Sequence, residues 1–129
     1  MKLLLDTHLI LWAASSPERL PRKALDLLSD NENELFFSAA NLWEITIKNG
    51  LGRADFKVDV SVLRRGLLDN GYNEIAITSQ HAIAVSGLQD IHRDPFDRVL
   101  VAQAITEGIT LLTADKLVAK YSGPIIDVG

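Results

Sequence analysis

The chain has 129 residues, 47% of them hydrophobic, a formal net charge of −4 and no cysteine. This length predicts one domain over residues 1–129, with a single core. The lack of cysteine excludes disulfides and sulfur-based zinc sites, and fits a reducing cytoplasm. The negative charge argues against a simple nucleic-acid coat, because phosphate binding normally needs a basic face. Asp6 interrupts the apolar start far short of a signal peptide or membrane span, so we expect a soluble cytoplasmic protein.

Short apolar strands alternate with helices along the first half of the chain. Hydrophobic spacing and turn residues predict a strand over 2–5, helices over 9–13 and 19–29, a strand over 35–37, and helices over 39–48 and 61–70. Ser38 is the predicted N-cap of the 39–48 helix, and Asn49-Gly50 and Gly71 end the two later helices. Residues 51–57 are predicted to form a loop.

The second half continues the same alternation. It predicts a strand over 74–77, a helix over 79–87 capped by Ser79, a loop over 88–93, a helix ending at Glu107, a strand over 109–112, a short helix over 116–121 and a strand over 125–128. Asp94 followed by Pro95 marks the start of the long helix, with Asp94 as N-cap and Asp97 at the third helical position.

This order predicts an α/β fold, a three-layer sandwich with a parallel sheet of about five strands covered on both faces. Ligands in such folds bind beyond the carboxyl ends of the strands, where the strand order reverses. Asp6 and Asp115 follow predicted strands, Asp97 begins a helix near that edge, and Glu44 lies in the second turn of another helix. Topology therefore predicts that four carboxylates converge.

Four crowded carboxylates raise one another's pKa unless a cation compensates their charge. Oxygen ligands suit Mg²⁺ or Mn²⁺, and such an ion can activate water and neutralise charge on a phosphodiester. Purely local roles stay open for each acid: Asp6 and Asp115 as helix caps, Asp97 as a partner of the helix dipole, and Glu44 in a solvated pair with Lys48. Asp94 is interpreted as a structural cap.

The polar neighbours have two interpretations as well. Thr7, Ser38 and Thr113 follow strands and could hydrogen-bond a carboxylate or a water at the site, or simply cap helices. The three histidines show no metal-ligand spacing, and His92 and Arg93 could touch phosphate, although a solvated loop is favoured for them. Trp12 and Trp43 are interpreted as packing residues rather than platforms for nucleic-acid bases.

Four segments together match a known family. They are Leu3-Leu4-Leu5-Asp6-Thr7-His8, Phe37-Ser38-Ala39-Ala40-Asn41-Leu42-Trp43-Glu44-Ile45, Asp94-Pro95-Phe96-Asp97-Arg98-Val99-Leu100-Val101-Ala102-Gln103-Ala104 and Leu111-Leu112-Thr113-Ala114-Asp115. In this order and spacing the chain resembles, over nearly its whole length, a PIN-domain ribonuclease of the VapC type, the toxin of a bacterial toxin–antitoxin pair.

The resemblance implies a strand order of 3-2-1-4-5 and Mg²⁺- or Mn²⁺-dependent endoribonuclease activity on RNA. It assigns catalysis to Asp6, Glu44, Asp97 and Asp115, with Asp6, Asp97 and Asp115 as metal ligands. It also implies a homodimer, inhibited by a small antitoxin that crosses the acidic groove. Rim residues that could contact the RNA backbone are Lys48, Arg53, Arg93 and Arg98.

Other classes of protein are compatible with parts of the pattern. A phosphatase with an Asp nucleophile generally has a second acid two residues on, which Asp6-Thr7-His8 lacks. A receiver-like switch would need its acceptor Asp after the third strand, where Ile77-Thr78-Ser79 offers none. A catalytically degenerate PIN-like binding module is the remaining alternative, and the presence of all four acids argues against it.

Overall fold

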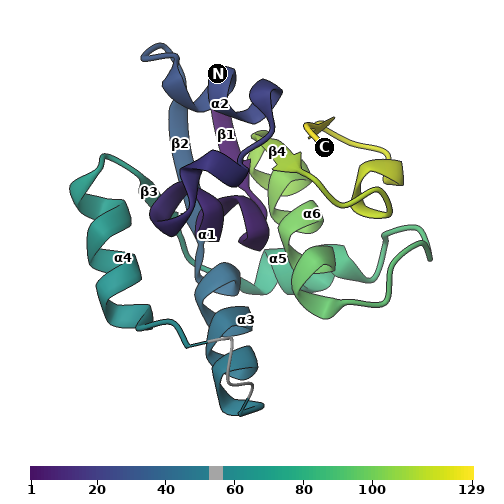
Figure 1. The fold of residues 1–129 in the computed structure, drawn as a ribbon. Helices are drawn as coiled ribbons and strands as arrows, with labels where there is room; N and C mark the ends of the chain where they lie inside the picture. Colours follow the sequence, from purple (N-terminus) through teal and green to yellow (C-terminus); the bar gives the residue numbers. More distant parts are fainter. Residues whose placement is uncertain (53–56) are drawn as a thin grey trace.

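The structure is a computed structural model that describes residues 1–52 and 57–129 (Figure 1). Its centre is a five-stranded sheet in which every neighbouring pair is parallel. The strands are β1 (Lys2–Leu5), β2 (Glu34–Ser38), β3 (Asn73–Ile75), β4 (Thr110–Thr113) and β5 (Ile125–Asp127). Their order, β3-β2-β1-β4-β5, confirms the predicted fold class. It differs from the order 2-1-3-4-5 of receiver domains, which removes the receiver-like alternative.

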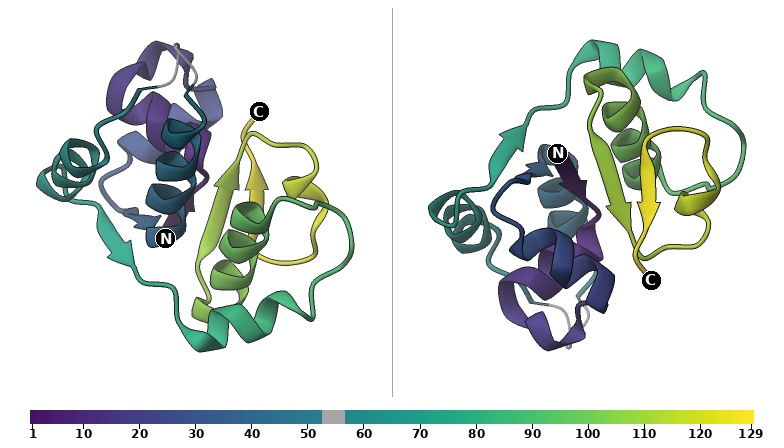
Figure 2. Two further views of the ribbon diagram at one scale, coloured as in Figure 1. Left: turned by 90° about the horizontal axis from the view of Figure 1, so that it is seen from below. Right: turned by 90° about the horizontal axis from the view of Figure 1, so that it is seen from above.

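Helices cover both faces of this sheet. They are α1 (Thr7–Ser15), α2 (Arg22–Ser29), α3 (Ala39–Gly50), α4 (Val60–Asp69), α5 (Ser79–Val85) and α6 (Pro95–Glu107), with short 3₁₀ turns η1 (Pro17–Arg19) and η2 (Val118–Lys120). The end views show the purple α1 and the green α6 on opposite sides of β4 (Figure 2). Helix α4 lies beside β3 at one edge, and the yellow C-terminal segment lies at the other (Figure 1).

The alternation of side chains along β1 explains the three layers. Leu3 and Leu5 join the core beneath α1, α2 and α4, whereas Leu4 joins the core beneath α6. All three leucines are fully buried. Burying one leucine contributes about 1.5–3 kcal/mol. A strand with apolar residues on both faces therefore belongs at the centre of the sheet. Asp6 directly follows this strand, so it lies at the point where the strand order reverses.

Three element boundaries differ from the predictions for local reasons. Helix α2 begins at Arg22 rather than at 19, because the residue before Pro21 is held in extended conformation and only η1 forms ahead of it. Thr78, not Ser79, caps α5, and it forms a capping box with His81. The predicted helix over 116–121 is a turn followed by η2.

None of the helices in the described part of the chain is long and apolar enough to cross a membrane.

Candidate active site

Asp6 lies at the carboxyl end of β1, where the sheet order reverses between β1 and β4. One carboxylate oxygen, Oδ1, accepts the backbone N–H of Leu9 at 2.9 Å and caps α1. The other, Oδ2, accepts the hydroxyl of Thr113 at 2.7 Å and the N–H of Ala114 at 3.0 Å. Burial raises the pKa of Asp6 above its ordinary value in spite of these bonds. Asp6 is therefore a cap and also a member of the acidic edge.

Glu44 reaches the same edge from the second turn of α3. Its buried carboxylate accepts the hydroxyl of Thr7 and pairs with the Lys48 ammonium at 2.8 Å. The predicted pair with Lys48 is thus present, but Glu44 is only 6% exposed, so the contact is not the solvated one that was expected. Buried Asn41 donates to the Thr7 hydroxyl at 3.0 Å and so fixes its orientation. Sequence patterns missed Asn41, although the capping box it forms with Ser38 was a readable signal.

Ser38 and Asp94 act as helix caps in this structure. The Ser38 hydroxyl accepts the backbone N–H of Ala40 at 3.0 Å at the start of α3. The Asp94 carboxylate accepts the N–H groups of Phe96 and Asp97 at 2.9 and 3.1 Å. Both contacts agree with the interpretation of these residues as helix caps.

Asp97, in the first turn of α6, feels the charge of the other acids. Burial, followed in order by the negative charges of Asp94, Glu44, Asp115 and Asp6, raises its pKa to about 8. Each of these carboxylates must lie close to Asp97 to act on it. The structure therefore brings together the four acids that topology predicted to converge.

Asp115 follows β4 and contacts both its own backbone and a histidine. Its Oδ1 accepts the N–H groups of Leu117 and Val118 at 2.8 and 3.3 Å, which caps the turn before η2. Its Oδ2 lies 3.4 Å from the His92 Nε2, and the same nitrogen lies 3.2 Å from the Asp97 Oδ2. The favoured interpretation of His92 as a solvated loop residue was wrong, because its side chain is only 19% exposed and sits between two acids.

The chemistry of these donors fits a hard divalent cation. One atom each from His92, Asp97 and Asp115 lies within 4.8 Å of the others. Part of the rise in the pKa of Asp97 comes from the negative charges of Asp94, Glu44, Asp115 and Asp6, which a bound cation would offset. Carboxylate oxygens are the ligands that Mg²⁺ and Mn²⁺ prefer, so a cation of this class would satisfy the edge.

The basic residues predicted for the rim have different environments. Arg93 is exposed on the loop before α6, and Lys48 is paired with Glu44 at the site. Arg98 is instead occupied within the protein, since its guanidinium donates to the backbone oxygens of Val85, Gln89 and His92 and to the Tyr121 hydroxyl. We therefore leave Arg98 out of the surface available to RNA. Arg53 lies outside the described residues.

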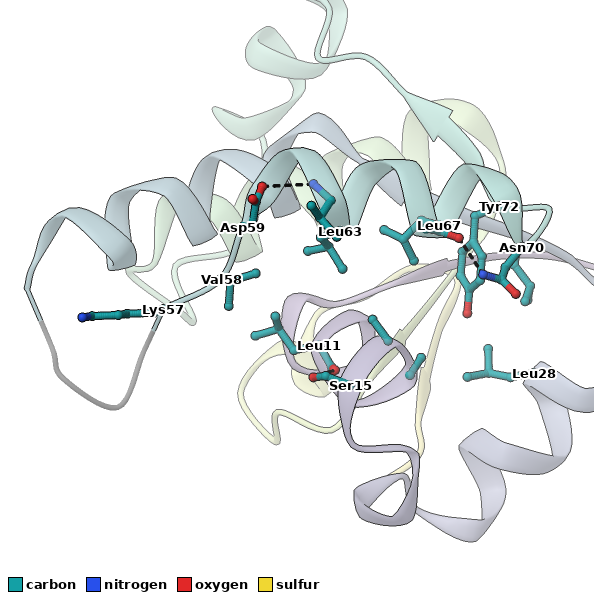
Figure 3. Close-up of a pocket in the computed structure, with 15 residues that line it drawn as sticks. Leu11, Ser15, Leu28, Lys57, Val58, Asp59, Leu63, Leu67, Asn70 and Tyr72 are labelled. Atoms are coloured by element: carbon teal, nitrogen blue, oxygen red, sulfur yellow. Dashed lines mark hydrogen bonds between the residues drawn. The ribbon is translucent and has the colours of Figure 1, made fainter.

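A hollow lies away from these acids, between α1 and α4. It measures about 800 Å³ and is lined by apolar side chains such as Leu11, Leu63 and Leu67, together with Asn70 and Tyr72 (Figure 3). The described residues that line it include none of the four acids. Cavity size therefore does not locate the chemistry of this protein, which depends on charge and donor atoms at the edge of the sheet.

Fold and site together define an α/β domain with a cluster of carboxylates at the switch point of a parallel sheet. The family model described as PIN domain matches residues 3–124. The chain belongs to the PIN-domain family. It is 28% identical over 122 residues to Ribonuclease VapC22 of Mycobacterium tuberculosis (strain ATCC 25618 / H37Rv), a match covering 94% of this chain and 92% of that protein.

Solved structures with the same fold come from toxin–antitoxin complexes. VapBC2 from Rickettsia felis, bound to a DNA fragment from its promoter, matches with a TM-score of 0.70 and 16% identity over the whole of both chains. A toxin–antitoxin complex from Klebsiella pneumoniae matches with a TM-score of 0.66 and 17% identity over 98% of each chain. At this level of identity these likenesses establish the shared fold.

Proposed function

We propose that this protein is a metal-dependent endoribonuclease that acts as the toxin of a toxin–antitoxin pair. The observation that carries the proposal is the environment of Asp97, whose pKa is raised to about 8 by burial and by four neighbouring carboxylates. An edge with that much uncompensated charge suits a divalent cation better than it suits a structural role. The name of the 28% identical relative, a ribonuclease, supports the same activity.

In this proposal Asp6, Asp97 and Asp115 hold Mg²⁺ or Mn²⁺. When bound, such a cation stabilises the charge that develops on a phosphodiester during hydrolysis. Glu44 acts as a further ligand or as the base that orients the attacking water. The Thr7 and Thr113 hydroxyls, which donate to Glu44 and Asp6, hold these two carboxylates in place.

RNA would approach over the rim of this edge. Arg93 is exposed there, and Lys48 lies beside Glu44, so both can contact the phosphate backbone. Such an enzyme would act in the cytoplasm, where cellular RNA is found. Arg53 stays a prediction from the sequence.

The activity test compares three purified proteins on mixed single-stranded RNA, with Mn²⁺ and with a chelator. Asp6→Asn is the informative variant, because asparagine keeps the helix cap but loses the carboxylate charge. Asp26→Asn is its control, since Asp26 lies exposed on α2 in a surface pair with Arg22. We expect Mn²⁺-dependent cleavage by the wild type and Asp26→Asn only. Cleavage that persists in chelator or in Asp6→Asn would contradict the proposal, and no cleavage by wild type would favour the degenerate binding module.

Two protein partners belong to the proposal. The solved complexes of the same fold support an antitoxin partner, and the proposal places this small protein across the acidic edge. A homodimer is supported by the apolar side chains of Trp43 and Ile47 on α3 and of its C-cap Leu51, which follow one another at intervals of four residues and are 56, 47 and 66% exposed. Growth arrest on expression, relieved by the product of a neighbouring small gene, tests the first. Light scattering of Trp43→Glu tests the second, and we expect a monomer.

A further inference from the structure

His92 faces both acids through one nitrogen, and its other nitrogen determines what the first can do. The Nδ1 atom accepts the backbone N–H of Asp94 at 3.2 Å. A ring nitrogen that accepts a hydrogen bond carries no proton, so Nε2 carries the proton of the imidazole. That Nε2–H lies 3.2 Å from the Asp97 Oδ2 and 3.4 Å from the Asp115 Oδ2. The N–H group is therefore hydrogen-bonded to the Asp115 carboxylate, and the Asp97 carboxylate lies within ion-pair distance of the same nitrogen.

We propose that His92 is a positioning residue, whose Nε2–H holds Asp97 and Asp115 side by side for a divalent cation without binding that cation itself. The inference rests on the proposed metal dependence. A histidine that binds a metal through Nε2 normally donates its Nδ1–H to an acceptor. Here Nδ1 faces the Asp94 N–H, which is a donor, and so the local backbone disfavours direct ligation.

The Asp115 carboxylate is fixed from its opposite side as well. Its Oδ1 is held by the N–H groups of Leu117 and Val118, which leaves Oδ2 directed at His92. Carboxylates that bind metals are themselves hydrogen-bonded by outer groups, and those groups set ligand orientation. His92 supplies such a bond to Asp115 and lies 3.2 Å from Asp97, so its N–H offsets the repulsion between the two acids.

A buried clamp holds His92 in this position. The Tyr121 hydroxyl accepts the His92 N–H at 2.9 Å and donates to the His92 carbonyl oxygen at 3.2 Å. The Arg98 guanidinium donates to that same carbonyl at 3.3 Å and to the Tyr121 hydroxyl at 3.0 Å. Arg98 follows Asp97 in α6, and Tyr121 follows η2 after Asp115. The clamp thus ties the loop of His92 to both segments that carry the acids.

The test measures Mn²⁺ affinity by calorimetry at one pH, independent of RNA cleavage. His92→Leu removes the donor, and we expect it to weaken Mn²⁺ binding about 10- to 100-fold, the usual cost of losing an outer partner of a ligand. His92→Gln keeps an N–H donor of similar reach and should recover most of that loss. Asp26→Asn changes an exposed side chain on α2 and should leave affinity unchanged. Tyr121→Phe, which keeps the buried ring, should cause a smaller loss than His92→Leu.

Electron spin-echo spectroscopy of bound Mn²⁺ separates positioning from ligation. We expect no directly coordinated imidazole nitrogen in the wild type. A coordinated nitrogen that disappears in His92→Leu would overturn the inference, as would unchanged Mn²⁺ affinity in a folded His92→Leu. If the wild type binds no Mn²⁺, both the proposed metal dependence and the proposed role of His92 are contradicted. Unchanged affinity in His92→Leu contradicts the role of His92 alone and leaves the proposed function standing.

Discussion

The Asp94 carboxylate accepts the backbone N–H of Asp97 at 3.1 Å, three residues further along the chain. Asp94 stands outside α6 as its cap, and Asp97 stands inside the first turn among the other acids. The charge of Asp94 is also the largest contribution from a neighbouring group to the raised pKa of Asp97. The residue that starts the helix therefore also tunes the acid that the helix presents.

Replacing Asp94 separates the cap from the charge. Asp94→Ala should lower the free energy of unfolding by about 0.5–2 kcal/mol, because two backbone N–H groups lose their acceptor. Asp94→Asn should keep most of this stability, since asparagine caps equally well. Urea unfolding of both variants checks the difference. If Asp94→Asn abolished cation binding at unchanged stability, Asp94 would be a ligand rather than a cap.

Asp97→Asn should reduce RNA cleavage by at least about 100-fold. The change removes a proposed cation ligand whose loss costs several kcal/mol of charge stabilisation, and each 1.4 kcal/mol is a factor of ten. The cation-free variant should be more stable than the wild type at pH 8, because a buried charge is gone. Cleavage rates and urea midpoints of the same preparation check both. Retained cleavage would remove Asp97 from the chemistry.

The stability of the cation-free protein should fall as the pH rises from about 4 to about 8. In the unfolded chain Asp97 titrates near 3.8 and in the folded protein near 8, so between these values the folded state binds more protons. The free energy of unfolding then decreases with pH, by at most about 1.4 kcal/mol per unit for one group. Asp6, whose pKa is also raised, acts in the same direction.

Thermal melts in chelator from pH 5 to pH 8 check this slope, and the difference between wild type and Asp97→Asn isolates the one carboxyl. We expect the variant to show a flatter dependence. Saturating Mn²⁺ at pH 8 should restore the thermal stability of the wild type, because a cation binds the ionised carboxylate. A wild type that gains stability relative to Asp97→Asn as the pH rises would contradict the assignment.

Arg98→Lys should destabilise the fold and weaken cation binding together. The guanidinium donates to three carbonyls and a hydroxyl at 3.0–3.3 Å, a geometry that a single ammonium cannot reproduce. We expect the free energy of unfolding to fall by about 1–3 kcal/mol, because carbonyl groups are left without a donor. Arg22→Lys, on the surface of α2, is the control, and it should lower the free energy of unfolding by less than about 0.5 kcal/mol. Equal costs for the two variants would show that the Arg98 network contributes nothing.

The sheet and the convergence of the acids could be predicted because short-range patterns specify them. Leu3, Leu4 and Leu5 can all be buried only in a strand covered on both faces, and a polar residue directly after such a strand lies at the edge where strands end. Glu44 and Asp97 followed from their positions in helices with readable caps.

His92 and Arg98 could not be predicted because their environments depend on the path of an irregular loop. No periodicity reports that residues 88–93 fold back over Tyr121, so His92 was taken as solvated and Arg98 as a rim residue. A positive charge in the sequence says nothing about how many carbonyl acceptors surround it. The hollow between α1 and α4 was missed for a similar reason, since it arises from how two helices pack (Figure 3).

The bond between the Thr113 hydroxyl and the Asp6 carboxylate joins residues 107 positions apart. A ribosome makes Asp6 107 residues before Thr113, so the Asp6 carboxylate lacks this donor while the intervening chain is being synthesised. The pairing of β1 with β2 can form early, but β4 must leave the exit tunnel before it can pair with β1. A chain truncated before β4 should therefore lose both the cation binding and the RNA cleavage that we propose, even though β1, β2 and three of the four acids are present.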